Sequence, residues 1–398
     1  MTKSANKGSS LIYIIILGML CAFPPICSDI YLPSLPEITT FYHSDPSKVQ
    51  LSLTSSFLGL SLGQVIIGPV SDAYGRRLPL IISLVIFSIA SYLCAKAPTV
   101  ELLILIRFFQ GVAASGGVVL ARSIACDKFK GSLLAQFMAL LMSINSIAPI
   151  MGPILGSFIV TYASWQYVFY FLAVWGGILF LLSSFKVPES HFPKDEDKNV
   201  IKAILDMLLE LKNIRFLLFT LSLSFVMGGF FSYLSASPFV FQVIYGLSPL
   251  QYSTGFGLIA ATISVTAIIS GRLVRRLGEI RVVLYSFALM LISAIVILFC
   301  SVFKFDSFIY IYLGLAVFCA MMGAVNTAGF SIVIESRRGG AGAASGIFGV
   351  MTFIFGAITT PLMGIMGENS MIPLGISVFV CTILAIVVFK LGLSFKNS

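Results

Sequence analysis

Long apolar runs, separated by short polar stretches, extend along the chain from residue 11 to residue 393. An α-helix needs about 20 consecutive apolar residues to cross the hydrocarbon core of a bilayer. The pattern therefore predicts twelve membrane-spanning helices. They lie at residues 11–33, 50–70, 78–97, 101–122, 133–160, 166–185, 214–240, 250–271, 281–302, 307–330, 341–366 and 372–393.

One long polar stretch, residues 186–212, separates the sixth run from the seventh. Its charged segment Lys194-Asp-Glu-Asp-Lys198 is typical of a solvated connector. Its later part carries apolar residues at helical spacing, which favours an amphipathic helix on the membrane surface. We therefore expect an all-α integral membrane protein with two six-helix bundles, at residues 1–185 and 214–398, joined by a linker at 186–213.

A short charged turn occurs once in each half. Gly68-Pro-Val-Ser-Asp72-Ala-Tyr-Gly75-Arg76-Arg77 follows the second run, and Gly271-Arg-Leu-Val-Arg275-Arg276-Leu-Gly278 follows the eighth. The glycines align, whereas Asp72 is matched by Arg275. A motif that recurs at half the chain length is typical of secondary transporters, whose halves are structural repeats.

Composition agrees with a membrane protein, because only 10% of the residues are charged and 58% are hydrophobic. Soluble domains carry about 25% charged residues. Of the 25 Lys and Arg residues, 21 fall on the side that holds both termini, and only Lys48, Lys96 and Lys304 fall on the other. This distribution predicts cytoplasmic termini and a cytoplasmic linker. The net charge of +9 therefore reflects topology and not nucleic-acid binding.

The remaining composition excludes several kinds of site. The seven Cys residues lie mostly in predicted spans without metal-ligand spacing, so we expect buried thiols and no metal site. His43 and His191 lie in loops, which leaves no histidine proton relay in the membrane. The first apolar run is too long for a signal peptide and lacks a cleavage site, so we expect an uncleaved first helix.

Several motifs of the first half resemble those of one transporter family. The segment from Gly68 to Arg77 is similar to the signature loop between helices two and three of the major facilitator superfamily. Leu103-Ile-Leu-Ile-Arg107-Phe-Phe-Gln110-Gly111 resembles that superfamily's fourth-helix motif. Ala148-Pro149-Ile-Met-Gly152-Pro153-Ile-Leu-Gly156 resembles the fifth-helix motif of its drug:proton antiporters. Asp29-Ile-Tyr31-Leu-Pro33-Ser-Leu-Pro36, together with Arg122 followed by Asp127, narrows the resemblance to Bcr/CflA-type multidrug exporters.

The resemblance implies a gate on the cytoplasmic side. Asp72 would contact the start of helix eleven near residues 339–342, and Arg76 or Arg77 would reach Asp127. The candidate gating residues are Gly68, Asp72, Gly75, Arg76, Arg77, Arg122 and Asp127. The alternative is a surface turn whose arginines only fix the topology.

The fifth-helix motif comprises Pro149, Gly152, Pro153 and Gly156. Two small residues four positions apart allow close helix packing, and a proline between them invites a bend. The resemblance implies that this motif packs the two halves together and limits leakage. Many membrane helices carry such a pattern for packing alone.

Asp29 is the one carboxylate that lies well inside a predicted span. Placing a charge there costs ~2.5–3.5 kcal/mol on insertion scales, so such residues usually serve a function. We expect Asp29 to carry the proton, unless Pro33 and Pro36 place it at the outer interface. Related multidrug exporters can carry a second acid two turns earlier, where this chain has Cys21.

Arg107 is the one basic residue within a predicted span. A permanent charge there requires a partner, water or a cavity, and the resemblance implies a role in proton transfer. The alternative is a structural pairing with backbone carbonyl groups.

The substrate cavity is harder to predict. Polar residues at mid-span and one aromatic cluster are the candidates, although each could instead bond between helices or face lipid. The candidates are Tyr31, Gln64, Gln110, Asn145, Phe225, Phe230, Tyr233 and Asn326.

Taken together, these patterns predict a transporter of the inner (cytoplasmic) membrane. We expect proton-coupled antiport that exports small drugs or metabolites by alternating access. A dedicated exporter of one siderophore, sugar or amino acid would use the same scaffold. An enzyme is disfavoured, since no span pairs a nucleophile with a base, and a channel would conduct without a proton gradient. Expected partners are a small-molecule substrate, protons and lipid, with a monomeric chain and no cofactor.

Overall fold

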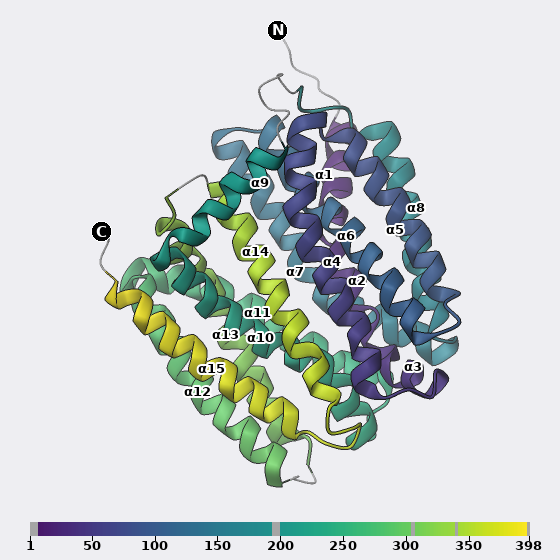
Figure 1. Cartoon of the computed structure of the whole chain (residues 1–398), viewed down its shortest axis with the longest axis vertical. Helices are drawn as coiled ribbons and strands as arrows, with labels where there is room; N and C mark the ends of the chain where they lie inside the picture. Colours follow the sequence, from purple (N-terminus) through teal and green to yellow (C-terminus); the bar gives the residue numbers. More distant parts are fainter. Residues whose placement is uncertain (1–6, 193–199, 304–306, 339–340, 396–398) are drawn as a thin grey trace.

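The computed structural model describes residues 7–192, 200–303, 307–338 and 341–395, which form helices and connecting loops (Figure 1). The first half contains α1 (Lys7–Cys21), α2 (Phe23–Asp29), η1 (Leu32–Ser34), α3 (Leu35–Phe41), α4 (Pro46–Tyr74), α5 (Arg77–Ala95), α6 (Val100–Lys128), α7 (Gly131–Tyr162) and α8 (Gln166–Lys186). The linker forms α9 (Val200–Leu209) and η3 (Glu210–Lys212). The second half contains α10 (Ile214–Pro238), the π-helix η4 (Phe239–Ile244), α11 (Pro249–Leu277), α12 (Glu279–Phe303), α13 (Ile309–Glu335), α14 (Ala341–Thr359), η5 (Thr360–Gly364) and α15 (Ile372–Ser394).

The structure has helices at all twelve predicted spans. Ten helices are long and apolar enough to cross a membrane, and the segments Tyr13–Cys21 and Phe23–Phe41 form another span, bent by 49°. The remaining predicted span, at residues 133–160, lies within the 32-residue helix α7. The bend follows from Pro24 and Pro25, which open α2 and cannot donate hydrogen bonds back to α1. It leaves Asp29 at the end of a short helix.

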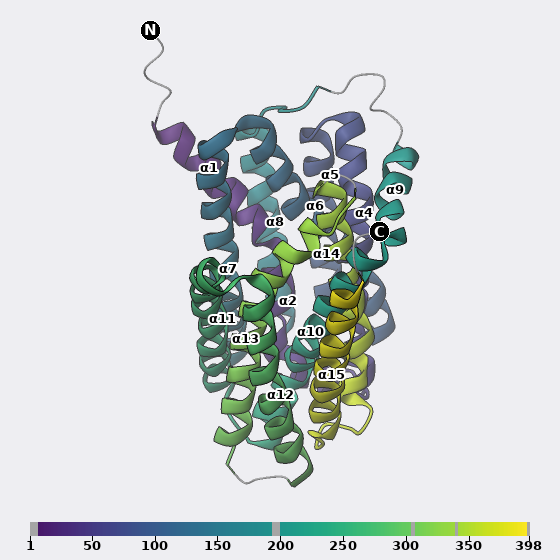
Figure 2. The ribbon, with the colours of Figure 1, turned by 90° about the vertical axis from the view of Figure 1, so that its left-hand side faces the viewer.

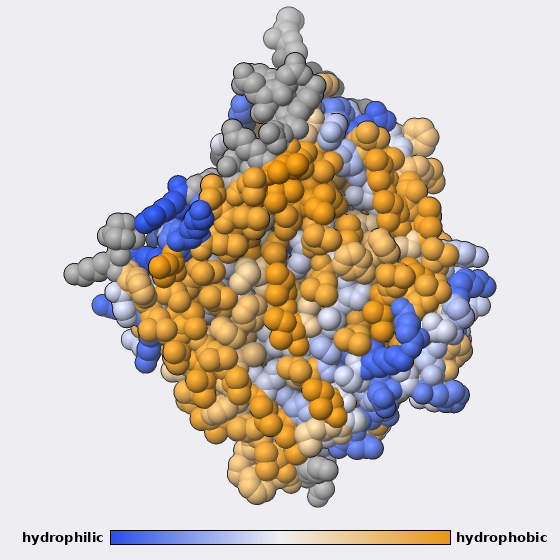
Figure 3. Space-filling model, in the orientation of Figure 1, coloured by the Kyte–Doolittle hydropathy of each residue, from blue (hydrophilic) through white to orange (hydrophobic). Residues whose placement is uncertain are grey.

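The face of the molecule seen in Figure 3 is largely apolar between its two ends. Large hydrophobic side chains of the spanning helices, such as Leu105, Phe158, Val265 and Ile292, are more than half exposed. In water this surface would be costly, whereas lipid tails solvate it. The hydrophobic surface therefore supports the assignment of these helices as membrane spans.

The two halves meet along α4 and α14 and along α7 and α11 (Figures 1 and 2). We call the side with the loops 74–77, 128–131 and 277–279 and the linker the linker face. On the opposite face the halves are joined by hydrogen bonds to main-chain oxygens. Ser47 Oγ donates to Pro361 O at 2.9 Å, and Gln50 Nε2 to Ser235 O at 3.3 Å.

Candidate functional site

A cavity of about 590 Å³ lies between the two halves. Its walls come from α2, α4, α6 and α7 on one side and from α10, α11, α13 and α14 on the other. It extends to Arg122 and Ser345, near the linker-side ends of α6 and α14. Since the halves are joined on the opposite face, the cavity opens toward the linker face.

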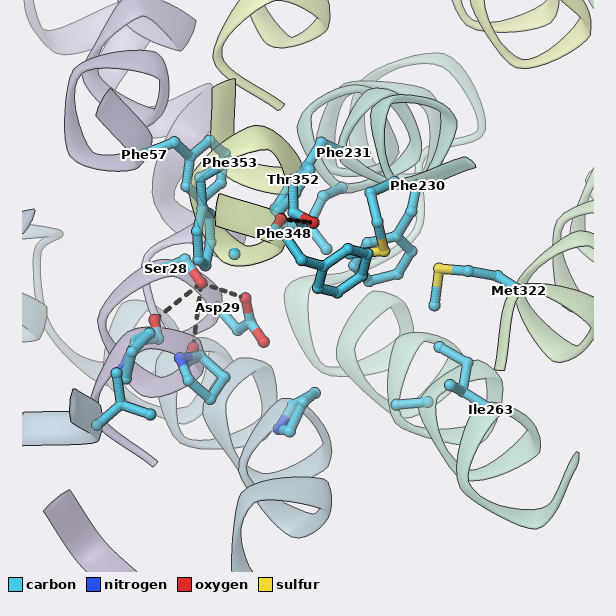
Figure 4. A pocket seen from close by; sticks show the side chains of 18 of the residues that line it. Ser28, Asp29, Phe57, Phe230, Phe231, Ile263, Met322, Phe348, Thr352 and Phe353 are labelled. Carbon is cyan, nitrogen blue, oxygen red and sulfur yellow. Dashed lines mark hydrogen bonds between the residues drawn. The ribbon is translucent and has the colours of Figure 1, made fainter. Parts of the chain in front are cut away.

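Aromatic side chains form much of the cavity wall (Figure 4). Phe57 and Phe231, from opposite halves, have ring centroids 4.5 Å apart, and Phe353 packs against both. Among the described lining residues, Asp29 and Arg122 are the two that carry a formal charge. A cavity of this size and polarity suits a drug-sized, largely apolar molecule.

Asp29 points from the end of α2 into this cavity and is 4% exposed (Figure 4). Ser28 Oγ donates to Asp29 Oδ1 at 2.6 Å, and the same hydroxyl lies 3.2 Å from Pro24 O. No Lys or Arg of the described chain lies within ion-pair distance of Asp29. The carboxyl group is therefore buried with a hydroxyl partner and without a counter-charge.

The glycines of the fifth-helix motif pack against the same segment. A Cβ at Gly156 would lie 2.1 Å from the carbonyl oxygen of Ile30, so α7 touches the backbone next to Asp29. Gly152 and Gly156 pack against α2 of the same half, whereas Ile150 and Ile154 of the same motif segment approach Gly257 of α11 in the other half. That the motif packs the two halves together and limits leakage stays a prediction. Of the motif residues, Pro149 lines the cavity and Pro153 is buried.

Arg107 is fully buried within the first bundle and does not line the cavity. Its Nη1 donates to Cys27 O at 3.4 Å and to Gln110 Oε1, and its guanidinium lies 4.8 Å from the ring centroid of Tyr31. Nε and Nη2 have no hydrogen-bond partner within the described ranges. Arg107 thus combines a backbone carbonyl contact with stacking on aromatic rings.

The cavity candidates divide into two groups. Gln64, Phe230 and Tyr233 line the cavity. Four others do not, and for them the prediction is wrong: Tyr31 bonds to Ser52, Gln110 to Ser91 and Arg107, Asn326 to Met227, and Phe225 packs on Phe355. The side chain of Asn145 lies outside the described part of the structure. Hydropathy alone does not show which face of a membrane helix meets a cavity, because lipid and protein interior are equally apolar.

Several residues that line the cavity are not predicted from the sequence. Phe348, Thr352 and Phe353 lie on one side of α14, and Met322 faces them from α13 (Figure 4). The spacing of Phe348 and Thr352 is the helical repeat that could have identified this wall.

Arg76 is the centre of the signature loop. It is buried, its Nε donates to Asp127 Oδ2 at 3.0 Å, and its Nη1 donates to Ser71 Oγ at 2.7 Å and to Asp72. Arg77 is exposed and donates to Ser184 O. The expected partner of Asp72 at residues 339–342 lies in a stretch whose side chains the structure does not describe. In both copies of the turn the closing glycine has a left-handed backbone, with φ of 88° at Gly75 and 80° at Gly278.

The start of the linker holds this loop in place. The Glu189 carboxylate accepts the backbone N–H groups of Arg76 at 2.8 Å and Arg77 at 3.1 Å, and also those of Ser190 and His191. Partial burial opposes ionisation, but these four donors outweigh it and hold the pKa of Glu189 below its usual value. Glu189 had no recognisable signal in the sequence.

Arg122 lies in a different place from the other gating candidates. It lines the cavity, and its guanidinium interacts with the thiol of Cys21. Its assignment to the gating cluster around Asp127 is therefore wrong in geometry. It belongs instead to the wall of the central cavity.

Comparisons with known proteins agree with this architecture. A family model described as Major Facilitator Superfamily matches residues 17–361. The chain is 35% identical over 377 residues to the uncharacterized MFS-type transporter YdgK of Bacillus subtilis, covering 94% of this chain and 93% of that one. It is 26% identical to a bicyclomycin resistance protein homolog of Haemophilus influenzae, covering 96% of each. It is also 28% identical to the multidrug resistance protein MdtL of Salmonella paratyphi C, over 63% of this chain and 64% of that one.

Solved structures show the same fold at low sequence identity. The D-xylose–proton symporter superposes with a TM-score of 0.79 and 14% identity, over 99% of this chain and 98% of that one. The nucleoside transporter NupG superposes with a TM-score of 0.75 and 17% identity, over 98% of this chain and all of the other.

Proposed function

Because this chain belongs to the major facilitator superfamily and is a multi-pass membrane transporter, we propose that it exports small drugs or metabolites by proton-coupled antiport. Asp29 carries this proposal, since it is the sole carboxyl group among the described residues that line the central cavity. The multidrug and bicyclomycin resistance relatives support export of drug-like molecules.

The linker face is cytoplasmic in this proposal, and both termini lie there, because 21 of the 25 Lys and Arg residues fall on that side. The structure then represents a cytoplasm-facing state. Residues 1–185 and 214–398 are the two units that rock, and residues 186–213 join them. The chain acts as a monomer in the cytoplasmic membrane.

The proposed cycle uses two forms of Asp29. In the cytoplasm-facing state the Asp29 carboxyl releases its proton to the water of the cavity, and the substrate enters. The loaded protein then turns outward, where the substrate leaves and a proton from outside binds an oxygen of Asp29. In each form the Ser28 hydroxyl has an acceptor within reach, Asp29 Oδ1 or Pro24 O. The two forms differ in charge, so they bias the equilibrium between the two orientations.

The loop around Arg76 would close the cytoplasmic side in the outward state. Its contacts with Asp127 and Asp72 lie within the first half, so they can persist while the halves separate. Arg107 would support the coupling by fixing the end of α2 through the carbonyl group of Cys27.

The test is transport in inverted membrane vesicles under an imposed pH gradient, with a panel of unrelated antibiotics and lipophilic cations. Asp29→Asn should abolish gradient-driven accumulation while leaving protein levels unchanged. Asp45→Asn is the matched control, since Asp45 is exposed and makes no capping hydrogen bond at α4. If vesicles with the Asp29→Asn variant accumulate the compounds as well as vesicles with the wild-type protein, the proposal is refuted. Accumulation of one metabolite alone would indicate a dedicated exporter.

A further inference from the structure

Arg122 is a charged group of the cavity for which the proposed transport cycle has no use. It lies on α6, fifteen residues beyond Arg107, which corresponds to about 22 Å along the helix axis. Arg107 donates a hydrogen bond to the carbonyl oxygen of Cys27, so it lies at the depth of Cys27, which is two residues before Asp29. The two charges of the cavity, Asp29 and Arg122, therefore lie toward its opposite ends.

The described residues offer Arg122 no carboxylate. Asp127, one turn further along α6, is occupied by Arg76 Nε and by Ser190 Oγ. The thiol of Cys21, a weak acceptor, is a group with which the Arg122 guanidinium interacts electrostatically. The Arg122 Nε is buried and has no hydrogen-bond partner among the residues that the structure describes. A guanidinium stays charged in proteins and presents paired donors that match a carboxylate, so Arg122 is a preformed site for an anionic group.

Between these two charges the cavity wall is mostly apolar. Phe57, Phe230, Phe231, Phe348 and Phe353 line it, and its volume suits a molecule of a few rings (Figure 4). A ligand that satisfies every part of the cavity has an aromatic body, an ammonium group at one end and a carboxylate at the other.

We propose that the central cavity selects elongated zwitterionic amphiphiles, with the carboxylate on Arg122 and the ammonium group on Asp29. The inference rests on the proposed antiport and names its substrate class. A ligand with an ammonium group also agrees with antiport, in which substrate and proton move in opposite directions. An ammonium group binds the ionised Asp29 and competes with the proton for the same carboxylate, so one excludes the other, as exchange requires. A purely anionic ligand would bind better to the protonated form, which favours cotransport.

The test uses the purified full chain in detergent and three probes with one biphenyl body. These are 4′-(aminomethyl)biphenyl-4-carboxylate, its carboxamide, which keeps the ammonium group, and its N-acetyl derivative, which keeps the carboxylate. Equilibrium dialysis of labelled probes gives each dissociation constant. We expect the zwitterion to bind wild-type protein at least about tenfold more tightly than the carboxamide, since a bidentate charge-assisted contact is lost.

Arg122→Gln should remove the preference for the zwitterion over the carboxamide. The affinity for the carboxamide should stay unchanged, which also shows that the variant is folded. Arg122→Lys should restore part of the preference. Cys21→Glu should also abolish it, by giving Arg122 an internal carboxylate. Arg281→Gln removes an exposed charge on α12 and should change nothing.

A wild-type protein without the carboxylate preference, or an Arg122→Gln variant that retains it, would overturn the zwitterion site. Failure of all three probes to bind would overturn it as well. None of these results affects the vesicle experiment with Asp29→Asn. If the vesicles show gradient-driven transport but the purified protein does not bind the zwitterion more tightly than the carboxamide, the antiport proposal stands and only the zwitterion site is refuted.

Discussion

Gly152 of α7 faces Asp29 of α2 so closely that a Cβ at position 152 would lie 3.1 Å from the Cβ of Asp29. The fifth-helix motif therefore sets the position of the proposed proton carrier. In this arrangement the glycine face of α7 and the carboxyl group form one structural unit.

Gly152→Ala should reduce pH-gradient-driven transport severalfold, because the added methyl group forces Asp29 to move by a few tenths of an ångström. Transport in vesicles, normalised to the amount of protein, measures this effect. Gly177→Ala on α8 is the control, since a Cβ there meets nothing within 4 Å. Equal activity of the two variants would show that the position of Asp29 tolerates the methyl group.

Gly156→Ala should act on stability. A Cβ at this position would lie 2.1 Å from the carbonyl oxygen of Ile30, and a backbone atom cannot rotate away. Overpacking of this kind costs about 1–3 kcal/mol. We expect a lower midpoint of thermal unfolding in detergent than for wild type, whereas Gly177→Ala should leave the midpoint unchanged or raise it slightly.

Glu189→Gln should alter the pH dependence of stability. The folded protein lowers the pKa of Glu189 below the ordinary value of about 4.3, so its ionised form stabilises the fold. That contribution is complete above the ordinary value and is lost as the pH falls through the folded-state pKa. Thermal unfolding measured from pH 7 down to about pH 3, below the ordinary pKa of a glutamate, should show a wild-type advantage over Glu189→Gln that shrinks in the most acidic part of this range. An advantage independent of pH would contradict the role of the charge.

Phe353→Ala should weaken binding of the biphenyl carboxamide. Loss of one aromatic contact costs about 0.5–1.5 kcal/mol, which corresponds to about two- to tenfold in affinity. Phe225→Ala is the matched control, since Phe225 packs on Phe355 outside the cavity wall. Equal losses in both variants would mean that the ligand does not touch Phe353.

The sequence was sufficient for the spans and the repeat but not for the cavity. Twenty-residue apolar runs have one stable outcome in a bilayer, and the turns at Gly75 and Gly278 require the same left-handed glycine. Pro24 and Pro25 bend the first span, and the position that this bend gives to Asp29 depends on tertiary packing. Tyr31 and Gln110 are polar residues within predicted spans, yet they bond within the first bundle.

The position of Arg122 on the cavity wall is also not predictable from the sequence alone. Arg122 lies in a span-terminal segment, where a basic residue usually marks the cytoplasmic boundary. Its place on the cavity wall depends on the angle between α6 and its neighbours, which no local pattern contains. Side chains that face a cavity and those that face lipid obey the same hydropathy rule, so tertiary packing has to separate them.

The closure of the opposite face involves main-chain atoms, because Ser47 and Gln50 donate to carbonyl groups of the other half, as does Gln242 to Pro33. A carbonyl oxygen is present whatever residue stands at its position. Mutations that reshape the phenylalanine-lined wall therefore leave these acceptors in place. The wall of the central cavity can therefore change through substitutions without loss of the hydrogen bonds that close the opposite face.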